Sequence, residues 1–166
     1  KSLFICTGGG PGIMEAANRG AHEMAVPTVG LNIGLPHEQH ANRYQNITLT
    51  FQHFFARKVM FVKYAKAYVG MPGGFGTLDE VIEALTRIQT GKTTRMPVIL
   101  VHAPFWSGLL DWFRETLVRE GVIDKDDMDL VTVVNTADEV LDVIFRYYEE
   151  SGFETSEAER EIKLNL

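Results

Sequence analysis

Two hydrophobic patterns alternate along the chain. Short apolar runs, several of them rich in Val and Ile, are typical of buried strands. Longer stretches, in which apolar residues recur every three or four positions, indicate amphipathic helices. The pattern predicts strands at residues 1–7, 27–33, 47–51, 65–71, 97–102 and 130–134 and helices at residues 13–24, 53–65, 78–88, 109–120 and 137–149.

This order of elements predicts the fold class. Strands and helices that alternate along a chain build a parallel sheet with right-handed crossovers and helices on both faces. We therefore expect an α/β protein with a Rossmann-like, doubly wound parallel sheet in a single domain. The domain is expected to span residues 1–150, and residues 151–166 are expected to form a polar, acidic and loosely held tail. In such a fold, ligands bind at the carboxyl edge of the strands.

The turn after the fourth predicted strand is rich in glycine. It reads Met71-Pro72-Gly73-Gly74-Phe75-Gly76-Thr77 and leads into the helical pattern that begins at Leu78. Its three glycines allow positive φ angles and a close approach of the backbone to a ligand. The N-terminus of the following helix offers unpaired N–H groups and the positive end of the helix dipole. This turn is therefore predicted to bind an anion, most plausibly a phosphate.

Glu80, just after this turn, has two interpretations. Thr77 and Glu80 have the spacing of a capping box, in which Thr77 caps the helix and the Glu80 carboxylate folds back on the cap. The alternative is a catalytic carboxylate beside the phosphate. The spacing alone favours neither interpretation.

A second glycine loop, Gly8-Gly9-Gly10-Pro11-Gly12, follows the first predicted strand. It does not match the dinucleotide-binding fingerprint, because Ile13 stands in the place of the third glycine. The loop is either a tight strand-to-helix turn or part of a shared ligand edge, and the presence of two such loops favours the shared edge. The aromatic pair Phe105-Trp106 is also expected in a loop at this edge.

The helix predicted at residues 53–65 is apolar on nearly every side, which indicates burial in the core or at a subunit contact. Arg57, Lys58 and Lys63 interrupt this apolar surface, and charges in such surroundings need partners. Arg57 has no acidic residue three or four positions away, so a carboxylate or a phosphate ester is its expected partner. A snorkelling side chain is the alternative. The surplus apolar surface, with Phe51, predicts a homo-oligomer, most simply a two-fold dimer.

Composition limits the classes of function. The 166 residues are 45% hydrophobic and 23% charged, which fits one globular domain, and the formal charge is −6. A negative chain argues against a generic surface for nucleic acids or anionic membranes. The single Cys6 excludes an internal disulfide and is expected to be a buried, inert thiol. No signal peptide or membrane-spanning apolar run is recognised, so a cytoplasmic protein is expected.

Three smaller features of the sequence do not predict a functional site. His37 and His40 have the spacing of a metal-binding pair, but no third ligand accompanies them, so no metal site is predicted. Gly91-Lys92-Thr93 mimics the end of a Walker A motif, yet it follows a helix and is interpreted as a helix stop. Arg43, in the polar loop near these histidines, receives no role.

Three motifs together resemble the LONELY GUY (LOG) family of nucleoside 5'-monophosphate phosphoribohydrolases. They are Thr7-Gly8-Gly9-Gly10-Pro11-Gly12-Ile13-Met14-Glu15, the pair Arg57-Lys58, and Pro72-Gly73-Gly74-Phe75-Gly76-Thr77-Leu78-Asp79-Glu80. The likeness extends from about Leu3 to about Asn135, and the PGGxGTxxE pattern is specific. Members of this family are often labelled lysine decarboxylases. They have a further strand-helix unit before this point, so the sequence is expected to lack the start of the domain.

The resemblance implies an activity and a set of site residues. The activity is hydrolysis of the N-glycosidic bond of a nucleoside 5'-monophosphate, either AMP or an N6-prenylated adenine nucleotide, without a cofactor. Arg57 and Glu80 are implied to be catalytic and to converge on the ribose. The phosphate is implied to lie against Pro72, Gly73, Gly74, Gly76 and Thr77, and the ribose and base near Lys58, Gly9, Gly10, Gly12 and Met14. Family members are generally dimers or larger, in agreement with the apolar helix.

Two other classes of function remain open. A non-catalytic carrier of a nucleotide or of the molybdenum cofactor could use the same glycine-rich edge without turnover. A pyridoxal-phosphate decarboxylase needs a Schiff-base lysine in a recognisable setting, and nothing in the sequence marks one. Arg57 and Glu80 separate the classes, because a protein that only binds does not require them.

Overall fold

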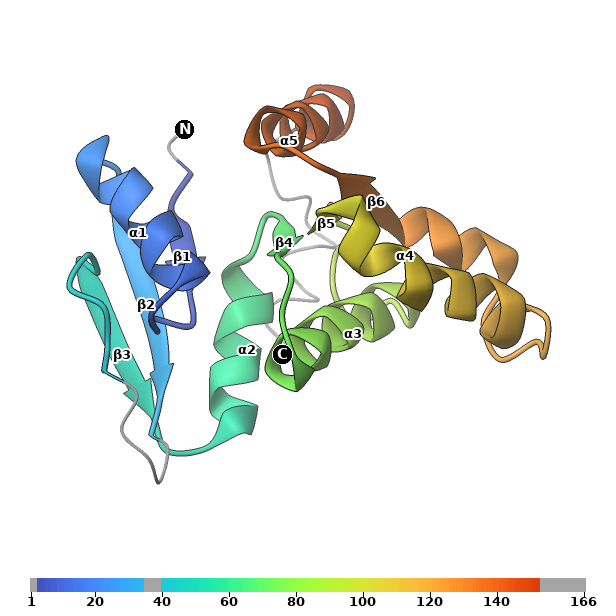
Figure 1. Cartoon of the computed structure of the whole chain (residues 1–166), viewed down its shortest axis with the longest axis horizontal. Helices are drawn as coiled ribbons and strands as arrows, with labels where there is room; N and C mark the ends of the chain where they lie inside the picture. Colours follow the sequence, from blue (N-terminus) through green and yellow to red (C-terminus); the bar gives the residue numbers. More distant parts are fainter. Residues whose placement is uncertain (1–2, 35–39, 153–166) are drawn as a thin grey trace. The chain divides into compact units, whose positions relative to one another are not determined.

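A computed structural model describes residues 3–34 and 40–152 of the chain (Figure 1). Strands and helices alternate along the sequence and the strands pair in parallel, so the predicted α/β class is confirmed. The chain forms two compact units, residues 1–64 and 65–166, which are described one at a time. His37 of the predicted histidine pair and residues 153–166 of the predicted tail lie outside the described residues.

The first unit contains a three-stranded sheet and two helices. Its elements are β1 (Ile5–Thr7), α1 (Ile13–Glu23), β2 (Thr28–Ile33), β3 (Ile47–Phe51) and α2 (Phe54–Tyr64). β2 is the central strand and pairs in parallel with β1 and with β3. Helix α1 contacts β1 and β2, and α2 contacts β2 and β3. Each of these elements lies within its predicted range.

The second unit contains another three-stranded sheet. Its elements are β4 (Tyr68–Gly70), α3 (Phe75–Gln89), β5 (Val98–Val101), α4 (Ala103–Trp112), the π-helix η1 (Phe113–Val118), the 3-10 helix η2 (Lys125–Leu130), β6 (Val131–Val134) and α5 (Ala137–Ser151). β5 is central and pairs in parallel with β4 and β6. Helices α3 and α5 lie on opposite sides of this sheet, as a doubly wound fold requires (Figure 1).

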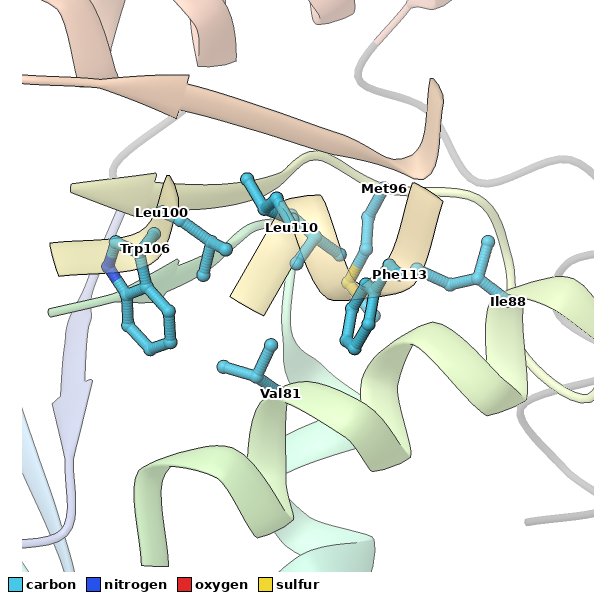
Figure 2. Close-up of a cluster of buried hydrophobic side chains, with 8 residues drawn as sticks. Val81, Ile88, Met96, Leu100, Trp106, Leu110 and Phe113 are labelled. Carbon is cyan, nitrogen blue, oxygen red and sulfur yellow. The ribbon is translucent and has the colours of Figure 1, made fainter. Parts of the chain in front are cut away.

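The core of the second unit lies between its sheet and helices α3 and α4 (Figure 2). Strand β5 is buried along its whole length, which explains why it reads as a continuous apolar run and not as an alternating one. From α3, Val81 and Ile88 face the strand, and α4 contributes Trp106 and Leu110. Trp106 is 1% exposed, and its indole N–H donates to the Val101 carbonyl at 2.9 Å.

Helix α4 begins earlier than predicted. The sequence suggested a loop around Phe105-Trp106 and a helix from residue 109, but the helix begins at Ala103 and Trp106 belongs to the core. Pro104 in the first turn favours a helix start, and Asn135 Oδ1 accepts the Ala103 N–H at 3.0 Å. His102 makes the sharp turn out of β5 with a φ angle of 80°. The expectation of an aromatic loop at the strand edge is therefore wrong.

Helix ends follow the sequence signals more closely. Helix α3 ends at Gln89 and Gly91 has a φ angle of 68°, so the interpretation of Gly91-Lys92-Thr93 as a helix stop is confirmed. Thr136 caps α5 and accepts the Glu139 N–H at 3.3 Å. The 3-10 helix η2 was not predicted, because its short acidic sequence has no helical periodicity.

Two expectations about burial are wrong. Of the residues of α2, all of which are described, Val62 alone is buried, and Phe54, Phe55 and Tyr64 are 52%, 70% and 67% exposed. Burial of α2 in the core is thus excluded, while a subunit contact stays a prediction. Cys6 is exposed, because it lies on the edge strand β1. Neighbouring atoms still desolvate its thiol and raise its pKa to about 11 against the opposing effect of the Arg57 charge, so the thiol is protonated at neutral pH.

Candidate active site

The glycine turn of the second unit joins β4 to α3. Gly74 is the N-cap of α3 and has an extended backbone, with φ −91° and ψ −152°. The N–H groups of Thr77 and Leu78 both donate to the Gly74 carbonyl at 3.1 Å. The N–H groups before Thr77 belong to the first turn, where an α-helix supplies no acceptor. The turn therefore has the helix end that was predicted to bind an anion.

The glycines of this turn provide space and do not adopt positive φ angles, so the expectation of positive φ is wrong here. Positive φ angles occur at other glycines of the described chain and not at Gly73, Gly74 or Gly76. A Cβ atom at Gly73 would lie 2.9 Å from Thr77 Cβ and closer still to its hydroxyl. At Gly74 and Gly76, an added Cβ would meet no described atom within 4 Å. These two positions leave the face of the turn open.

The predicted capping box at Thr77 and Glu80 is wrong. The helix begins at Phe75, so Thr77 is its third residue, and no described side chain caps it. An extended Gly74 allows this earlier start, whereas a capping box would require Thr77 itself to be extended. Glu80 lies three positions beyond Thr77, on the same face of α3, and its Oε2 atom is buried. Capping therefore does not explain the presence of Glu80.

The glycine loop of the first unit joins β1 to α1 and does need positive φ. Gly9 and Gly12 have φ angles of 75° and 70°, and Gly12 is the N-cap of α1. Gly9 and Gly10 are buried. A Cβ atom at Gly9 would lie 2.7 Å from Asn32 Cγ. This loop is thus closely packed at Gly9, whereas the loop before α3 is open at Gly74 and Gly76.

Arg57 reaches this loop from helix α2. Its Nε donates to the Leu31 carbonyl at 2.7 Å, and its guanidinium carbon lies 5.2 Å from the centre of the Phe61 ring. A Cβ atom at Gly8 would lie 2.9 Å from Met14 Sδ and closer still to Arg57 Nη2. Arg57 and Met14 thus meet at Gly8, directly after β1. The alternative of a snorkelling arginine is wrong, because this guanidinium is held against the backbone of the loop.

A network of side-chain amides beneath the first loop was missed in the sequence. Asn18 is 0% exposed and Asn42 is 8% exposed, and Asn42 Nδ2 donates to Asn18 Oδ1 at 3.0 Å. Thr7 and Gln45 complete the network through the loop backbone. One signal was available. Asn18 interrupts the apolar face of the helix predicted at residues 13–24, four positions after Met14 and three before Ala21.

The remaining candidates are placed as follows. Lys58 is half-buried on α2, next to Arg57. Arg43 donates to the Tyr44 hydroxyl at 2.9 Å, and its guanidinium carbon lies 5.0 Å from the centre of the Tyr44 ring. Neither of these two contacts involves a glycine loop. His40 is exposed. Within residues 3–34 and 40–152, no cluster of three or more His, Cys, Asp or Glu side chains could hold a metal ion. None of the described helices is long and apolar enough to cross a membrane.

The structure thus collects the predicted residues in two groups. The first unit brings the loop residues Gly9, Gly10, Gly12 and Met14 together with Arg57. The second unit places Pro72, Gly73 and Gly74 in the turn before α3, and Gly76 and Thr77 one helical turn before Glu80. Both groups lie at the carboxyl ends of parallel strands, β1 and β4. The convergence of Arg57 and Glu80 on one ribose stays a prediction.

Parallel strands that end in glycine turns, each leading into a helix N-terminus, define an α/β protein of the doubly wound class. The family is more specific. Residues 14–144 match the family described as "possible lysine decarboxylase", and the chain belongs to this family, which is the LOG family.

Curated relatives carry the name of a nucleotide hydrolase. The cytokinin riboside 5'-monophosphate phosphoribohydrolase LOG3 of Arabidopsis thaliana is 25% identical over 150 residues, which cover 89% of this chain and 69% of that protein. The cytokinin riboside 5'-monophosphate phosphoribohydrolase of Mycobacterium marinum is 28% identical over 139 residues, which cover 83% of this chain and 74% of that protein.

A solved structure shares the fold. The molybdenum cofactor binding protein of Rippkaea orientalis superposes with a TM-score of 0.63 at 23% identity, over 87% of this chain and 77% of that one. At this identity the likeness concerns the fold and not the ligand.

Proposed function

We propose that this protein hydrolyses the N-glycosidic bond of nucleoside 5'-monophosphates, AMP or N6-prenylated adenine nucleotides, and releases the free base and ribose 5-phosphate. Membership of the LOG family and the names of the relatives support this proposal. The observation that carries it is the position of Glu80. This carboxylate lies one turn from an open, glycine-lined helix N-terminus and has no capping function there.

The second unit supplies the phosphate site and a carboxylate. The first turn of α3 has open space at Gly74 and Gly76, and in this proposal its N–H groups bind the 5'-phosphate with the help of the helix dipole. Cleavage of an N-glycosidic bond develops positive charge on the ribose. A carboxylate near the phosphate stabilises that charge, holds the ribose hydroxyls or orients the attacking water. Glu80 has this role in the proposal.

The first unit supplies a fixed cation and a packed loop. Arg57 is held by the Leu31 carbonyl and by Phe61, so its guanidinium is presented at the start of the loop without loss of side-chain freedom on binding. It pairs with the substrate phosphate or with a ribose oxygen. Gly9, Gly10, Gly12, Met14 and Lys58 line the ribose and the base.

A direct assay tests the proposal. Purified protein is incubated with AMP and with N6-prenyl-AMP, and the free base and ribose 5-phosphate are quantified by chromatography. Release of both products in equal amounts is expected. Tight binding of a nucleotide or of the molybdenum cofactor without release would favour the carrier function instead.

We also propose that the protein forms a homo-oligomer, most simply a dimer, through the exposed aromatic residues of α2. Phe54, Phe55 and Tyr64 are more than half exposed, although large aromatic side chains gain most from burial at an interface. Sedimentation velocity at micromolar concentration is expected to show a dimer or larger, and Phe55→Glu is expected to shift it toward the monomer. A wild-type protein that sediments only as a monomer would contradict this proposal.

A further inference from the structure

The carbonyl groups of the first glycine loop point into a set of side-chain amides. The Gly9 carbonyl accepts three hydrogen bonds, from Asn42 N–H at 2.8 Å, from Asn42 Nδ2 at 3.2 Å and from Gln45 Nε2 at 2.7 Å. The Gly10 carbonyl accepts from Asn42 Nδ2 at 3.1 Å. The segment that carries Asn42 and Gln45 is therefore fastened to the loop more than thirty positions earlier in the chain.

Asn42 is itself fixed on every side. Its Oδ1 accepts the Tyr44 N–H at 3.1 Å, and its Nδ2 also donates to Asn18 Oδ1 at 3.0 Å. Asn18 Oδ1 in turn accepts the Thr7 hydroxyl at 2.6 Å. Both asparagines are buried, so their amide groups have little water to exchange with. The network joins β1, α1 and the segment before β3 around the loop.

This arrangement fixes the orientation of one peptide group. In a trans peptide the carbonyl of one residue and the N–H of the next point in opposite directions, and no peptide bond of the described chain is cis. Because the Gly9 carbonyl points into the network, the Gly10 N–H points away from it. The next residue, Pro11, has no N–H group. If the Gly9–Gly10 peptide rotated, an acceptor would replace the donor that the loop offers.

We propose that Asn42, assisted by Gln45, is a positioning residue that holds the Gly9–Gly10 peptide with its N–H group turned toward the substrate. Asn42 touches no reacting atom in this proposal and acts through the loop. The proposal rests on the proposed function for the identity of the ligand, an adenine nucleotide. The orientation of the peptide itself is independent of that function.

The first unit offers matched variants. Asn42→Asp and Gln45→Glu keep the size of each side chain but replace the amide donor by a carboxylate, which repels the Gly9 and Gly10 carbonyls. Gln45→Glu removes one hydrogen bond to the loop, the one to the Gly9 carbonyl, so it replaces Asn42→Asp as the test variant if Asn42→Asp does not fold. The control is Asn46→Ala, because Asn46 also binds backbone in this unit, where its Oδ1 accepts the Thr28 N–H at 2.9 Å, but it does not contact the loop.

The first measurement needs no ligand. Hydrogen exchange is followed by NMR in the free protein at the amides of Gly9 and Asn42, which donate to the Thr7 hydroxyl at 3.0 Å and to the Gly9 carbonyl at 2.8 Å. Exchange is expected to be roughly tenfold faster or more in Asn42→Asp and in Gln45→Glu, and unchanged at these amides in Asn46→Ala. Equal exchange in the wild type and in the folded variants would overturn the proposed network.

The second measurement uses AMP. Both network variants are expected to raise the dissociation constant and KM for AMP by roughly tenfold or more, with a smaller change in kcat. Asn46→Ala is expected to leave KM unchanged, even where it lowers the melting temperature as much as the network variants do. If KM rises equally in the control, Asn42 is a general stability residue and the proposal is wrong. If the wild type does not bind AMP, the proposed function fails, and the exchange measurement still decides whether the network orients the loop.

Discussion

The two glycine turns of this protein look alike in sequence but differ in construction. The turn before α1 buries Gly9 and Gly10, uses positive φ at Gly9 and Gly12, and is held by side-chain amides from a distant segment. The turn before α3 has no positive φ at its glycines, and two of its three glycines face open space. The first loop thus needs glycine at Gly9 for its own conformation, whereas the second leaves open space at Gly74 and Gly76, where the phosphate is proposed to bind.

This difference separates stability from function. A substitution at Gly8 or Gly9 of the first loop disturbs the fold before it disturbs a ligand, because the space for a side chain there is already occupied. A substitution at Gly74 or Gly76 meets nothing in the described chain, so its cost falls on whatever binds there. The open space at Gly74 and Gly76 therefore leaves room for a ligand at this turn, as the proposed function requires.

The largest effect is expected at the two charged residues that accompany the turns. Glu80→Gln is expected to fold normally and to lower kcat for AMP by roughly 10²-fold or more, the scale of losing a positioned electrostatic or acid-base group. Arg57→Met should give a similar loss, with a small decrease in melting temperature. The kcat for AMP and the melting temperature are measured together for each variant. Near wild-type turnover in Glu80→Gln would remove its catalytic role and favour the carrier function.

The double variant sharpens this comparison. If Arg57 and Glu80 act on the same reacting centre, their combined loss in kcat/KM will be clearly smaller than the product of the two single losses. Independent roles would instead give the product. This cycle tests the prediction that Arg57 and Glu80 converge on one ribose.

The next effect is expected in the first loop. Gly9→Ala places a side chain at a φ angle of 75° and against Asn32, so a loss of at least ~1–2 kcal/mol in the free energy of unfolding is expected. Urea denaturation measures it. Gly12→Ala is the matched variant, because its φ angle is 70° but no described atom lies within 4 Å of the added Cβ. Gly12→Ala should cost less than Gly9→Ala, and the difference isolates the contact with Asn32.

Much of the fold could be predicted because its signals are local. The strands from Thr28 and from Ile47 and the helices from Ile13 and from Phe54 follow from hydrophobic periodicity alone. The early start of α4 could not be predicted. It depends on Asn135, which is 32 positions away and accepts the Ala103 N–H. The capping box failed for a related reason, since Gly74 allowed an extended backbone three residues before the expected cap, Thr77.

The site was partly predictable in the same sense. The glycine motifs predicted the two strand-to-helix turns that the structure contains, while their role in binding stays a prediction. The absence of a local partner for Arg57 indicated one from elsewhere, and the Leu31 carbonyl is such a partner, whereas the expected carboxylate or phosphate stays a prediction. The amide network could not be assembled from sequence, because Asn18 and Asn42 meet only once β1, β2 and α1 have folded together. Polar residues that satisfy buried backbone groups have no periodic pattern of their own.

A smaller effect, of opposite sign, is expected in the second turn. Gly76 lies in the first turn of α3, and Ala is the better helix former there, so Gly76→Ala should raise the free energy of unfolding by about 0.5–1 kcal/mol. The same methyl group narrows the open face, so KM for AMP should rise. A variant that is more stable and binds less well would confirm that this glycine serves the ligand. Unchanged KM would place the phosphate elsewhere.

The smallest effect uses Cys6 as a reporter of Arg57. Desolvation raises the pKa of this thiol from 9.0 to about 11, and the Arg57 charge lowers it by a smaller amount. Since only the thiolate reacts, alkylation by iodoacetamide at pH 8 should be roughly 100-fold slower than for a thiol of pKa 9.0 with the same access to the reagent, and the rate should rise until about pH 11. The raised pKa also predicts that the free energy of unfolding falls between pH 9 and pH 11, because the unfolded state then loses the proton first.

The test compares two replacements of Arg57. Arg57→Lys keeps the positive charge and should leave the alkylation rate close to that of the wild type. Arg57→Met keeps much of the packing but removes the charge, so the pKa of Cys6 should rise further and the rate should fall by a few-fold. If both variants react at the wild-type rate, the guanidinium does not lie beside β1, and its assigned place at Gly8 would be wrong. If Arg57→Met alone is slower, the charge of Arg57 is fixed at the first loop before any substrate binds. The second turn, with its open face, differs from the first loop in this respect.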